Sequence, residues 1–239
     1  MQSKTIIFCL VLIELSFVLT ADKTITIFIA GDSTAAPRDT SNDNPERGWG
    51  QMLQDYFNKN FVTVDNHARG GRSSKSFIDE GRWDEILKLM KKGDYAIIQF
   101  GHNDGVEDEE RHTDPSTTFI EYLSKYATDT IEHGGIPILM SPVSRRWWKN
   151  GQLVDGHGEY RYGAEKAAEK LGVHFVDACS ITYKVIEDLG DEGSKKLFMV
   201  SEGKDDNTHY TILGATTTAR LLAQGMVDEI PELAEYYKK

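Results

Sequence analysis

The sequence contains little cysteine: only Cys9 and Cys179 occur among its 239 residues. Cys9 lies in an N-terminal stretch that has the pattern of an export signal, and it would be removed together with that stretch. One remaining cysteine cannot form an internal bridge, which excludes a fold held together by disulfides. We interpret Cys179 as a small buried apolar side chain rather than as a nucleophile.

Basic residues are also scarce relative to acidic ones. The chain has 27 Lys and Arg against 38 Asp and Glu, which gives a net charge of −11. This charge argues against nucleic acid or an anionic membrane surface as a partner. Long uncharged apolar runs are absent, so we expect no membrane-spanning helix. Hydrophobic residues make up 39% of the chain, which is enough for a packed core.

The N-terminal stretch predicts a signal peptide. Lys4 precedes an apolar segment over residues 6–19, and residues 20–21 offer a small-residue cleavage site. Glu14 is atypical inside such a segment, and an ordinary buried N-terminal segment is the alternative. We expect cleavage after residue 21 and a secreted or periplasmic protein.

Strand patterns alternate with helical patterns along the rest of the chain, residues 22–239. The strand patterns cover residues 24–30, 61–64, 95–100, 136–140 and 173–176. Helical patterns cover residues 49–56, 77–90 with a break at Gly81, 119–131 with Asp114 as the N-cap, 160–171, 181–189 and 212–226. No repeat or linker interrupts this order. We therefore expect one α/β domain with a five-stranded parallel sheet covered on both faces.

Polar, glycine-rich turns follow the first three strands, at residues 31–34, 70–73 and 101–104. In a parallel sheet the ligand site lies beyond the carboxyl ends of the strands, so these turns should converge at one edge. Glycine and short polar residues also simply end strands, which would explain any one turn. That explanation does not cover a fourth segment, in which Asp206 and His209 open the final helix.

These four segments together suggest an acyl-transfer site. A serine hydroxyl such as that of Ser33 becomes a nucleophile when a histidine removes its proton, and a carboxylate then orients the imidazole. Asp206 and His209 are close enough in sequence for one turn to hold both. The backbone N–H groups of Ser33 and Gly71 and the amide of Asn103 can form an oxyanion hole. Each motif is weak by itself, and only the combination predicts a function.

The ordered set Gly31-Asp32-Ser33, Gly71, Gly101-His102-Asn103-Asp104 and Asp206-x-x-His209 resembles the four blocks of the SGNH (GDSL-type) hydrolases. Within that superfamily the chain is similar to the rhamnogalacturonan acetylesterases. The segments that carry this closer similarity are residues 27–34, 47–50, 70–77, 100–104 and 141–148.

The resemblance implies a flavodoxin-like three-layer α/β/α sandwich that removes acetyl groups from pectic polysaccharide. Carried over by position, Ser33 is the nucleophile, His209 the base and Asp206 the residue that orients it. Gly71 and Asn103 then complete the oxyanion hole. The implied partner is an acetylated acidic polysaccharide or oligosaccharide, and no cofactor is needed.

His102 and Asp104 flank Asn103, and two interpretations of them stay open. They can line the substrate pocket, or they can hold the turn. His102, Asp104, Asp206 and His209 are also all metal-ligand types. We expect no metal there, because a serine and two glycine turns would have no purpose in such a site.

The segment from Val143 to Lys149 combines cationic and aromatic side chains. Tryptophan faces suit sugar rings and cations suit uronate carboxylates, so we expect Arg145, Arg146 and Trp147 to contact substrate. A solvated loop with its tryptophans packed on the core is the alternative.

Two other functions are compatible with this pattern. One is an SGNH esterase that acts on another acetylated glycan or on a lipid ester, although the sequence has no apolar insertion that could form a lipase lid. The other is a catalytically silent carbohydrate-binding module, against which the intact set of serine, histidine, aspartate and asparagine argues.

Overall fold

The computed structural model describes residues 24–238, so the expected signal peptide over residues 1–21 lies outside the described residues. Its central sheet has five parallel strands in the order β3-β1-β4-β5-β8. The strands are β1 (Ile25–Gly31), β3 (Val62–Asn66), β4 (Tyr95–Gln99), β5 (Ile136–Met140) and β8 (His174–Val176). The expected five-stranded parallel sheet is confirmed.

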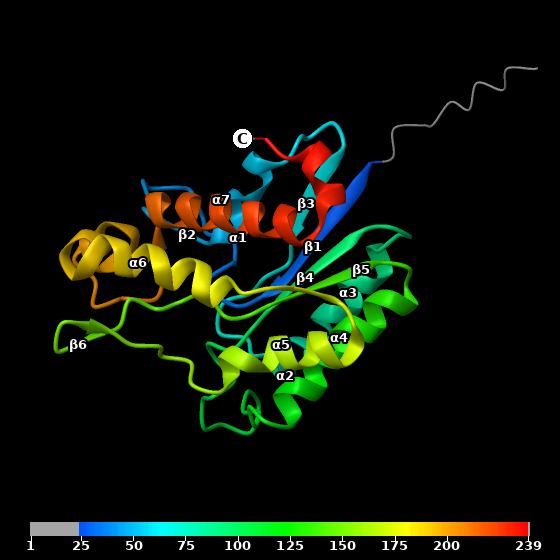
Figure 1. Ribbon diagram of the computed structural model, residues 1–239, viewed down its shortest axis with the longest axis horizontal. Coiled ribbons are helices and arrows are strands. Elements are labelled where there is room, and N and C mark those ends of the chain that lie inside the picture. Colours follow the sequence, from blue (N-terminus) through cyan, green and yellow to red (C-terminus); the bar gives the residue numbers. More distant parts are fainter. Residues whose placement is uncertain (1–23, 239) are drawn as a thin grey trace, which may run out of the picture.

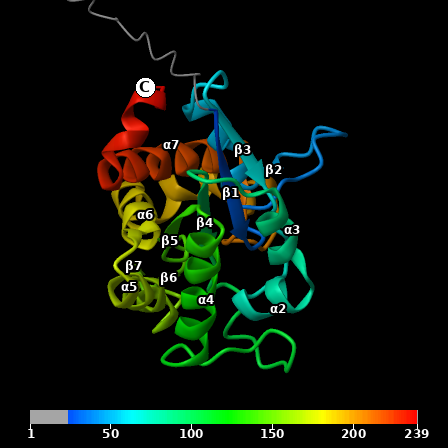
Figure 2. The same cartoon turned by 90° about the vertical axis from the view of Figure 1, so that its right-hand side faces the viewer.

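The sheet is buried on both faces, as the alternation of side chains in β1 illustrates. Ile25, Ile27 and Ile29 belong to one hydrophobic cluster, and Phe28 and Ala30 belong to a second cluster on the opposite face. Successive side chains of a strand point to opposite faces, so each face needs its own layer of helices. Both layers are present, which confirms the three-layer α/β/α sandwich (Figures 1 and 2).

Helices from different parts of the chain form the two outer layers. The first cluster is covered by α1 (Trp49–Met52), α6 (Ala178–Ser194) and α7 (Ile212–Glu229). The second is covered by α2 (Ser74–Asp79), α3 (Arg82–Leu89), α4 (Thr118–Glu132) and α5 (Tyr160–Leu171). No helix within residues 24–238 is long and apolar enough to cross a membrane.

The helical segments follow the sequence pattern, but several of their ends differ. Helix α6 runs over Ala178–Ser194 rather than residues 181–189, and α7 continues to Glu229 rather than ending at residue 226. Helix α5 has the predicted bounds, and the predicted break at Gly81 separates α2 from α3, with Gly81 at φ +73°. The prediction of Asp114 as N-cap is wrong, because α4 begins at Thr118. The Asp114 carboxylate instead accepts hydrogen bonds from the Ser116 N–H and the Thr117 hydroxyl, both at 2.9 Å, and so closes a separate turn before the helix.

Several short elements have no counterpart in the sequence pattern. They are the antiparallel pairs of β2 (Glu46–Arg47) with β9 (Tyr210–Thr211) and of β6 (Trp148–Lys149) with β7 (Gln152–Leu153), and the 3₁₀ turns η2 (Lys195–Leu197), η3 (Met199–Glu202) and η4 (Pro231–Tyr236). The 3₁₀ turn η1 (Leu53–Tyr56), by contrast, lies within the helical pattern over residues 49–56. A two-residue strand shows no periodicity, so sequence patterns cannot reveal it. The β2–β9 pair matters most, because it joins the loop after β1 to the segment just before α7.

Candidate active site

The turn that carries Ser33 is built on a buried carboxylate. Asp32 Oδ1 accepts hydrogen bonds from the N–H and the hydroxyl of Thr34 at 2.9 and 2.8 Å, and Asp32 Oδ2 lies 2.9 Å from His102 Nδ1. Burial raises the Asp32 pKa, but the His102 imidazole and the Thr34 bonds outweigh burial and bring the pKa down to about 2. Asp32 is therefore ionised and fixes the turn from inside, while the Ser33 side chain stays partly exposed.

A second buried pair supports the same turn. The Thr34 hydroxyl lies 3.1 Å from Gln99 Oε1, which accepts a hydrogen bond from Trp49 Nε1 at 3.1 Å. Asp32, Thr34 and Gln99 were not predicted as site residues. The sequence signal for Gln99 is a polar residue at the end of an otherwise apolar strand, where a buried amide needs partners.

The turn from Asp206 to His209 orients the imidazole. Asp206 Oδ1 accepts hydrogen bonds from the N–H groups of Thr208 and His209, both at 2.9 Å, and Asp206 Oδ2 lies 2.7 Å from His209 Nδ1. Burial raises the Asp206 pKa, but the hydrogen bonds from His209 and Thr208 outweigh it, so the pKa lies below its ordinary value. The carboxylate is thus ionised and faces His209 Nδ1.

The chain on both sides of this turn is anchored. The N–H of Val200 bonds the Asp206 carbonyl at 2.8 Å, and the N–H of Met199 bonds the His209 carbonyl at 2.9 Å. Directly after His209, β9 pairs with β2. These contacts hold the imidazole next to the loop that follows β1.

The imidazole reaches the serine directly. His209 Nε2 lies 2.9 Å from Ser33 Oγ, although the two residues are 176 positions apart. With its Nδ1–H donated to Asp206, the imidazole presents Nε2 as the acceptor for the serine proton. Asp206, His209 and Ser33 therefore form one continuous chain of hydrogen bonds.

The expected oxyanion-hole groups come from three different loops. Gly71 has φ +79° and is exposed, and a Cβ built on it would meet no atom within 4 Å. A Cβ on the preceding Gly70 would lie 3.6 Å from the Ser33 Cβ, so this glycine loop lies against the serine. Asn103 Nδ2 donates to the Arg72 carbonyl at 3.0 Å, which fixes the amide beside the same loop. The loops thus bring the three expected donors to one edge of the sheet.

His102 and Asp104 do not face a substrate. Both are buried, and His102 bonds Asp32. Asp104 accepts hydrogen bonds from the N–H of Ser74 and the N–H of Gly101, both at 2.9 Å. Burial and the nearby Asp32 charge raise the Asp104 pKa to about 7, although the Ser74 bonds oppose that shift. Of the two interpretations that the sequence left open, lining the substrate pocket is wrong, and holding the turn describes both residues.

Arg146 is also not a substrate contact. Its side chain is only 6% exposed. The guanidinium donates hydrogen bonds to the Ser194 hydroxyl at 3.1 Å, to Asn207 Oδ1 at 2.6 Å and to the Asp191 carbonyl at 2.7 Å. It also forms an ion pair with the Asp191 carboxylate. All three guanidinium nitrogens are thus engaged by protein partners. Because Asn207 follows Asp206 directly, Arg146 anchors the turn that carries the imidazole.

Its neighbours do border open space. Trp147 is 43% exposed, with Lys149 Nζ 4.4 Å from the centre of its ring. Arg145 is half-buried and donates to the His102 carbonyl at 2.9 Å. Arg145 and Trp147 line a pocket of about 280 Å³ together with the edge of Arg146 and with Asp205, Asn207 and Thr208 from the segment that orients His209. Contact of Arg145 and Trp147 with substrate stays a prediction.

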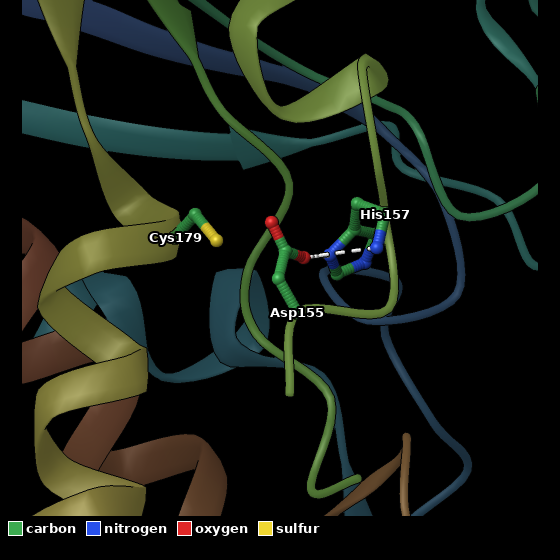
Figure 3. Close-up of side chains that lie close together, drawn as sticks. All are labelled: Asp155, His157 and Cys179. Carbon is green, nitrogen blue, oxygen red and sulfur yellow. Dashed lines mark hydrogen bonds and ion pairs between the residues drawn. The ribbon is translucent and has the colours of Figure 1, made fainter. Parts of the chain in front are cut away.

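One group of metal-ligand side chains occurs in the described part of the chain. The ligand atoms of Asp155, His157 and Cys179 lie within 4.8 Å of one another (Figure 3). His157 Nδ1 bonds Asp155 Oδ1 at 3.2 Å, and the Arg161 guanidinium lies 3.6 Å from the same carboxylate, where it disfavours a cation. Burial raises the Cys179 pKa to about 11, so the thiol is neutral, as expected for a small buried residue. The set of His102, Asp104, Asp206 and His209 does not gather around a common point.

We expect Arg146→Ala to lower kcat/KM for a small activated ester as much as for a polymer, on the order of tenfold to a hundredfold, because the Asp206–His209 turn loses its anchor. The free energy of unfolding should fall by about 2–4 kcal/mol, since Ser194 and Asn207 lose a charged partner. Thermal unfolding and p-nitrophenyl acetate hydrolysis measure both effects.

The matched control is Lys184→Ala, which removes an exposed cation from the helix that carries Asp191 and Ser194. If Arg146→Ala raised KM only for the polymer, as a substrate-binding residue would, the anchoring role would be wrong.

Comparison with known proteins agrees with this geometry. Residues 29–216 match the GDSL-like Lipase/Acylhydrolase family. The chain is 36% identical over 201 residues to the probable rhamnogalacturonan acetylesterase YesY of Bacillus subtilis, covering 84% of this chain and 91% of that protein. It is 37% identical over 214 residues to the rhamnogalacturonan acetylesterase RhgT of the same organism, covering 85% and 90%.

Among solved structures, YxiM of Bacillus subtilis superposes with a TM-score of 0.76 at 28% identity, and the match covers 86% of this chain and 57% of that protein. The family match extends from β1 to α7 and includes every loop that contributes to the Ser33–His209–Asp206 arrangement. The chain therefore belongs to the GDSL-like lipase/acylhydrolase family of carboxylic ester hydrolases.

Proposed function

We propose that this protein is a serine esterase that removes acetyl groups from pectic polysaccharide of the rhamnogalacturonan type. The observation that carries the chemistry is the hydrogen-bonded chain from Asp206 through His209 to Ser33, with contacts of 2.7 and 2.9 Å. The substrate class is supported by two Bacillus subtilis relatives, a probable rhamnogalacturonan acetylesterase and a rhamnogalacturonan acetylesterase, which are 36% and 37% identical to this chain over most of its length.

In the first half of the reaction, Ser33 Oγ attacks the acetyl carbonyl while His209 Nε2 accepts the serine proton. Asp206 keeps the imidazole oriented and stabilises its positive charge. The oxyanion of the tetrahedral intermediate is bound by the N–H groups of Ser33 and Gly71 and by the Asn103 amide. Each such donor contributes about 3–4 kcal/mol in the transition state.

The intermediate collapses when the sugar oxygen leaves with the proton from His209, and the acetyl group stays on Ser33. A water molecule then attacks the acetyl-serine, with His209 again as the base. Breakdown of the second intermediate releases acetate and returns the proton to Ser33. The residues described above supply every proton transfer in this sequence.

We expect Ser33→Ala and His209→Ala each to lower kcat by on the order of 10⁶, and Asp206→Ala to lower it by about 10⁴, because the aspartate orients the base but transfers no proton. Acetate release by the purified variants measures this. His133→Ala removes an exposed histidine at the end of α4 and should leave the rate unchanged. Wild-type rates in a folded Ser33→Ala sample would refute the serine mechanism.

Activity should decline towards acid pH as His209 becomes protonated, because a protonated imidazole cannot accept the serine proton. The Asp206 pKa lies below its ordinary value, so Asp206 stays ionised across this range and adds no second step. We expect kcat/KM for p-nitrophenyl acetate to fall steadily along the acid limb of its pH profile. A rate that does not fall towards acid pH would exclude His209 as the base.

Acetate release from a panel of acetylated polymers tests the substrate class. We expect acetylated rhamnogalacturonan to be hydrolysed with a higher kcat/KM than acetylated xylan or acetylated chitin oligomers. p-Nitrophenyl acetate serves as the control for an intact catalytic site. If xylan were deacetylated as fast as rhamnogalacturonan, the pectic assignment would be wrong and only the esterase assignment would stand.

A further inference from the structure

A second pocket adjoins the candidate active site next to the glycine loop. Its volume is about 290 Å³, and its walls are residues 36–38 of the loop after β1 and residues 68–70 and 72 of the loop after β3. Three of the lining side chains are arginines, Arg38, Arg69 and Arg72, and none is acidic. Such a concentration of positive charge is notable in a chain with a net charge of −11.

The pocket shares its walls with the reaction centre. Arg38 Nη2 donates to the Ser33 carbonyl at 2.7 Å, and the Arg69 N–H donates to the Gly31 carbonyl at 2.9 Å. The Arg72 carbonyl accepts the hydrogen bond from Asn103 Nδ2. Gly70, which lines the pocket, lies against Ser33. A group bound in this pocket would therefore lie beside the acetyl group that Ser33 attacks.

The acidic residues that contact these arginines do not neutralise them. Glu46 contacts both Arg38 at 2.6 Å and Lys204 at 3.4 Å. Glu80 contacts both Arg72 at 3.0 Å and an arginine outside the pocket, Arg82, at 2.6 Å. Each glutamate is thus shared between two cations, so both clusters keep a net positive charge.

Arg69 is the exposed cation of the pocket. Its side chain has no carboxylate partner within residues 24–238, while the Arg38 and Arg72 side chains are held by their glutamates. A free guanidinium can bind a carboxylate with two parallel hydrogen bonds, which gives both affinity and orientation. The pocket thus combines two fixed cations with one that is available to a ligand.

We propose that this pocket is a carboxylate subsite, which binds a uronate group of the substrate chain. The proposal rests on the proposed function and adds the feature that selects an acidic polymer over a neutral one. It also explains how a protein of net negative charge binds an anionic chain: attraction acts over a short range in the pocket, because more distant charges are screened within about 8–10 Å.

The test compares acetylated rhamnogalacturonan oligosaccharides in two forms, with free uronates and with methyl-esterified uronates, alongside p-nitrophenyl acetate. In wild type, methyl esterification should raise KM about tenfold, because it removes the charge that the arginines bind. The measured quantity is the kcat/KM for the oligosaccharide with free uronates divided by the kcat/KM for p-nitrophenyl acetate. Arg69→Ala should lower this ratio about tenfold, and Arg69→Glu should lower it further.

Two further measurements distinguish the loss of uronate binding from a general loss of activity. Methyl esterification should have little additional effect on Arg69→Ala, because the substitution has already removed the partner of the uronate. Arg69→Lys should restore part of the ratio, since it returns the charge without the two-pronged geometry. The matched control is Arg220→Ala, which removes an exposed arginine from α7 and should behave as wild type.

Two results would overturn the proposal while leaving the proposed function intact. One is a wild-type KM that is the same for the free and methyl-esterified oligosaccharides, a measurement that needs no variant. The other is an Arg69→Ala ratio equal to that of Arg220→Ala. If wild type hydrolysed p-nitrophenyl acetate but released no acetate from either oligosaccharide, both the proposed function and the subsite would be wrong.

Discussion

The carboxylate of Asp32 is the interaction on which the geometry of the site depends. It is fully buried, and it bonds the Thr34 turn after β1 and the His102 ring after β4 at the same time. Burying a lone charge costs several kcal/mol, so this carboxylate is tolerated only because all of its partners are in place. Ser33 is the next residue, and its backbone direction follows from the position of Asp32. The loops after β1 and β4 are therefore fixed relative to each other before any substrate arrives.

A different kind of support holds the base. The Asp206–His209 turn belongs to no long element, and it is held by backbone bonds from Met199 and Val200 and by the buried guanidinium of Arg146. The site thus joins a nucleophile on the rigid sheet to a base on an anchored loop. The arginines near the site also differ in role. Arg146 is buried and holds the Asp206–His209 turn in place, whereas Arg69 is exposed.

The sequence predicts the layered fold because buried parallel strands are short apolar runs that alternate with helical patterns, and such runs can be recognised without knowing which strands they pair with. It predicts Ser33, Asp206 and His209 because the reaction requires those residue types in turns that converge. It fails for His102, Asp104 and Arg146, because residue type does not reveal burial. Arg146 is engaged by Ser194 and Asn207, which lie 48 and 61 positions away. The pairing of β2 with β9 and the arginine pocket likewise depend on distant contacts.

The separation of Ser33 and His209 by 176 positions has a consequence for how the protein becomes active. Ser33 is synthesised well before His209 and α7, because 176 positions separate the serine from the histidine. Hydrolytic competence therefore arises only when the C-terminal segment docks beside β2, so a nascent or C-terminally truncated chain holds a serine without a base.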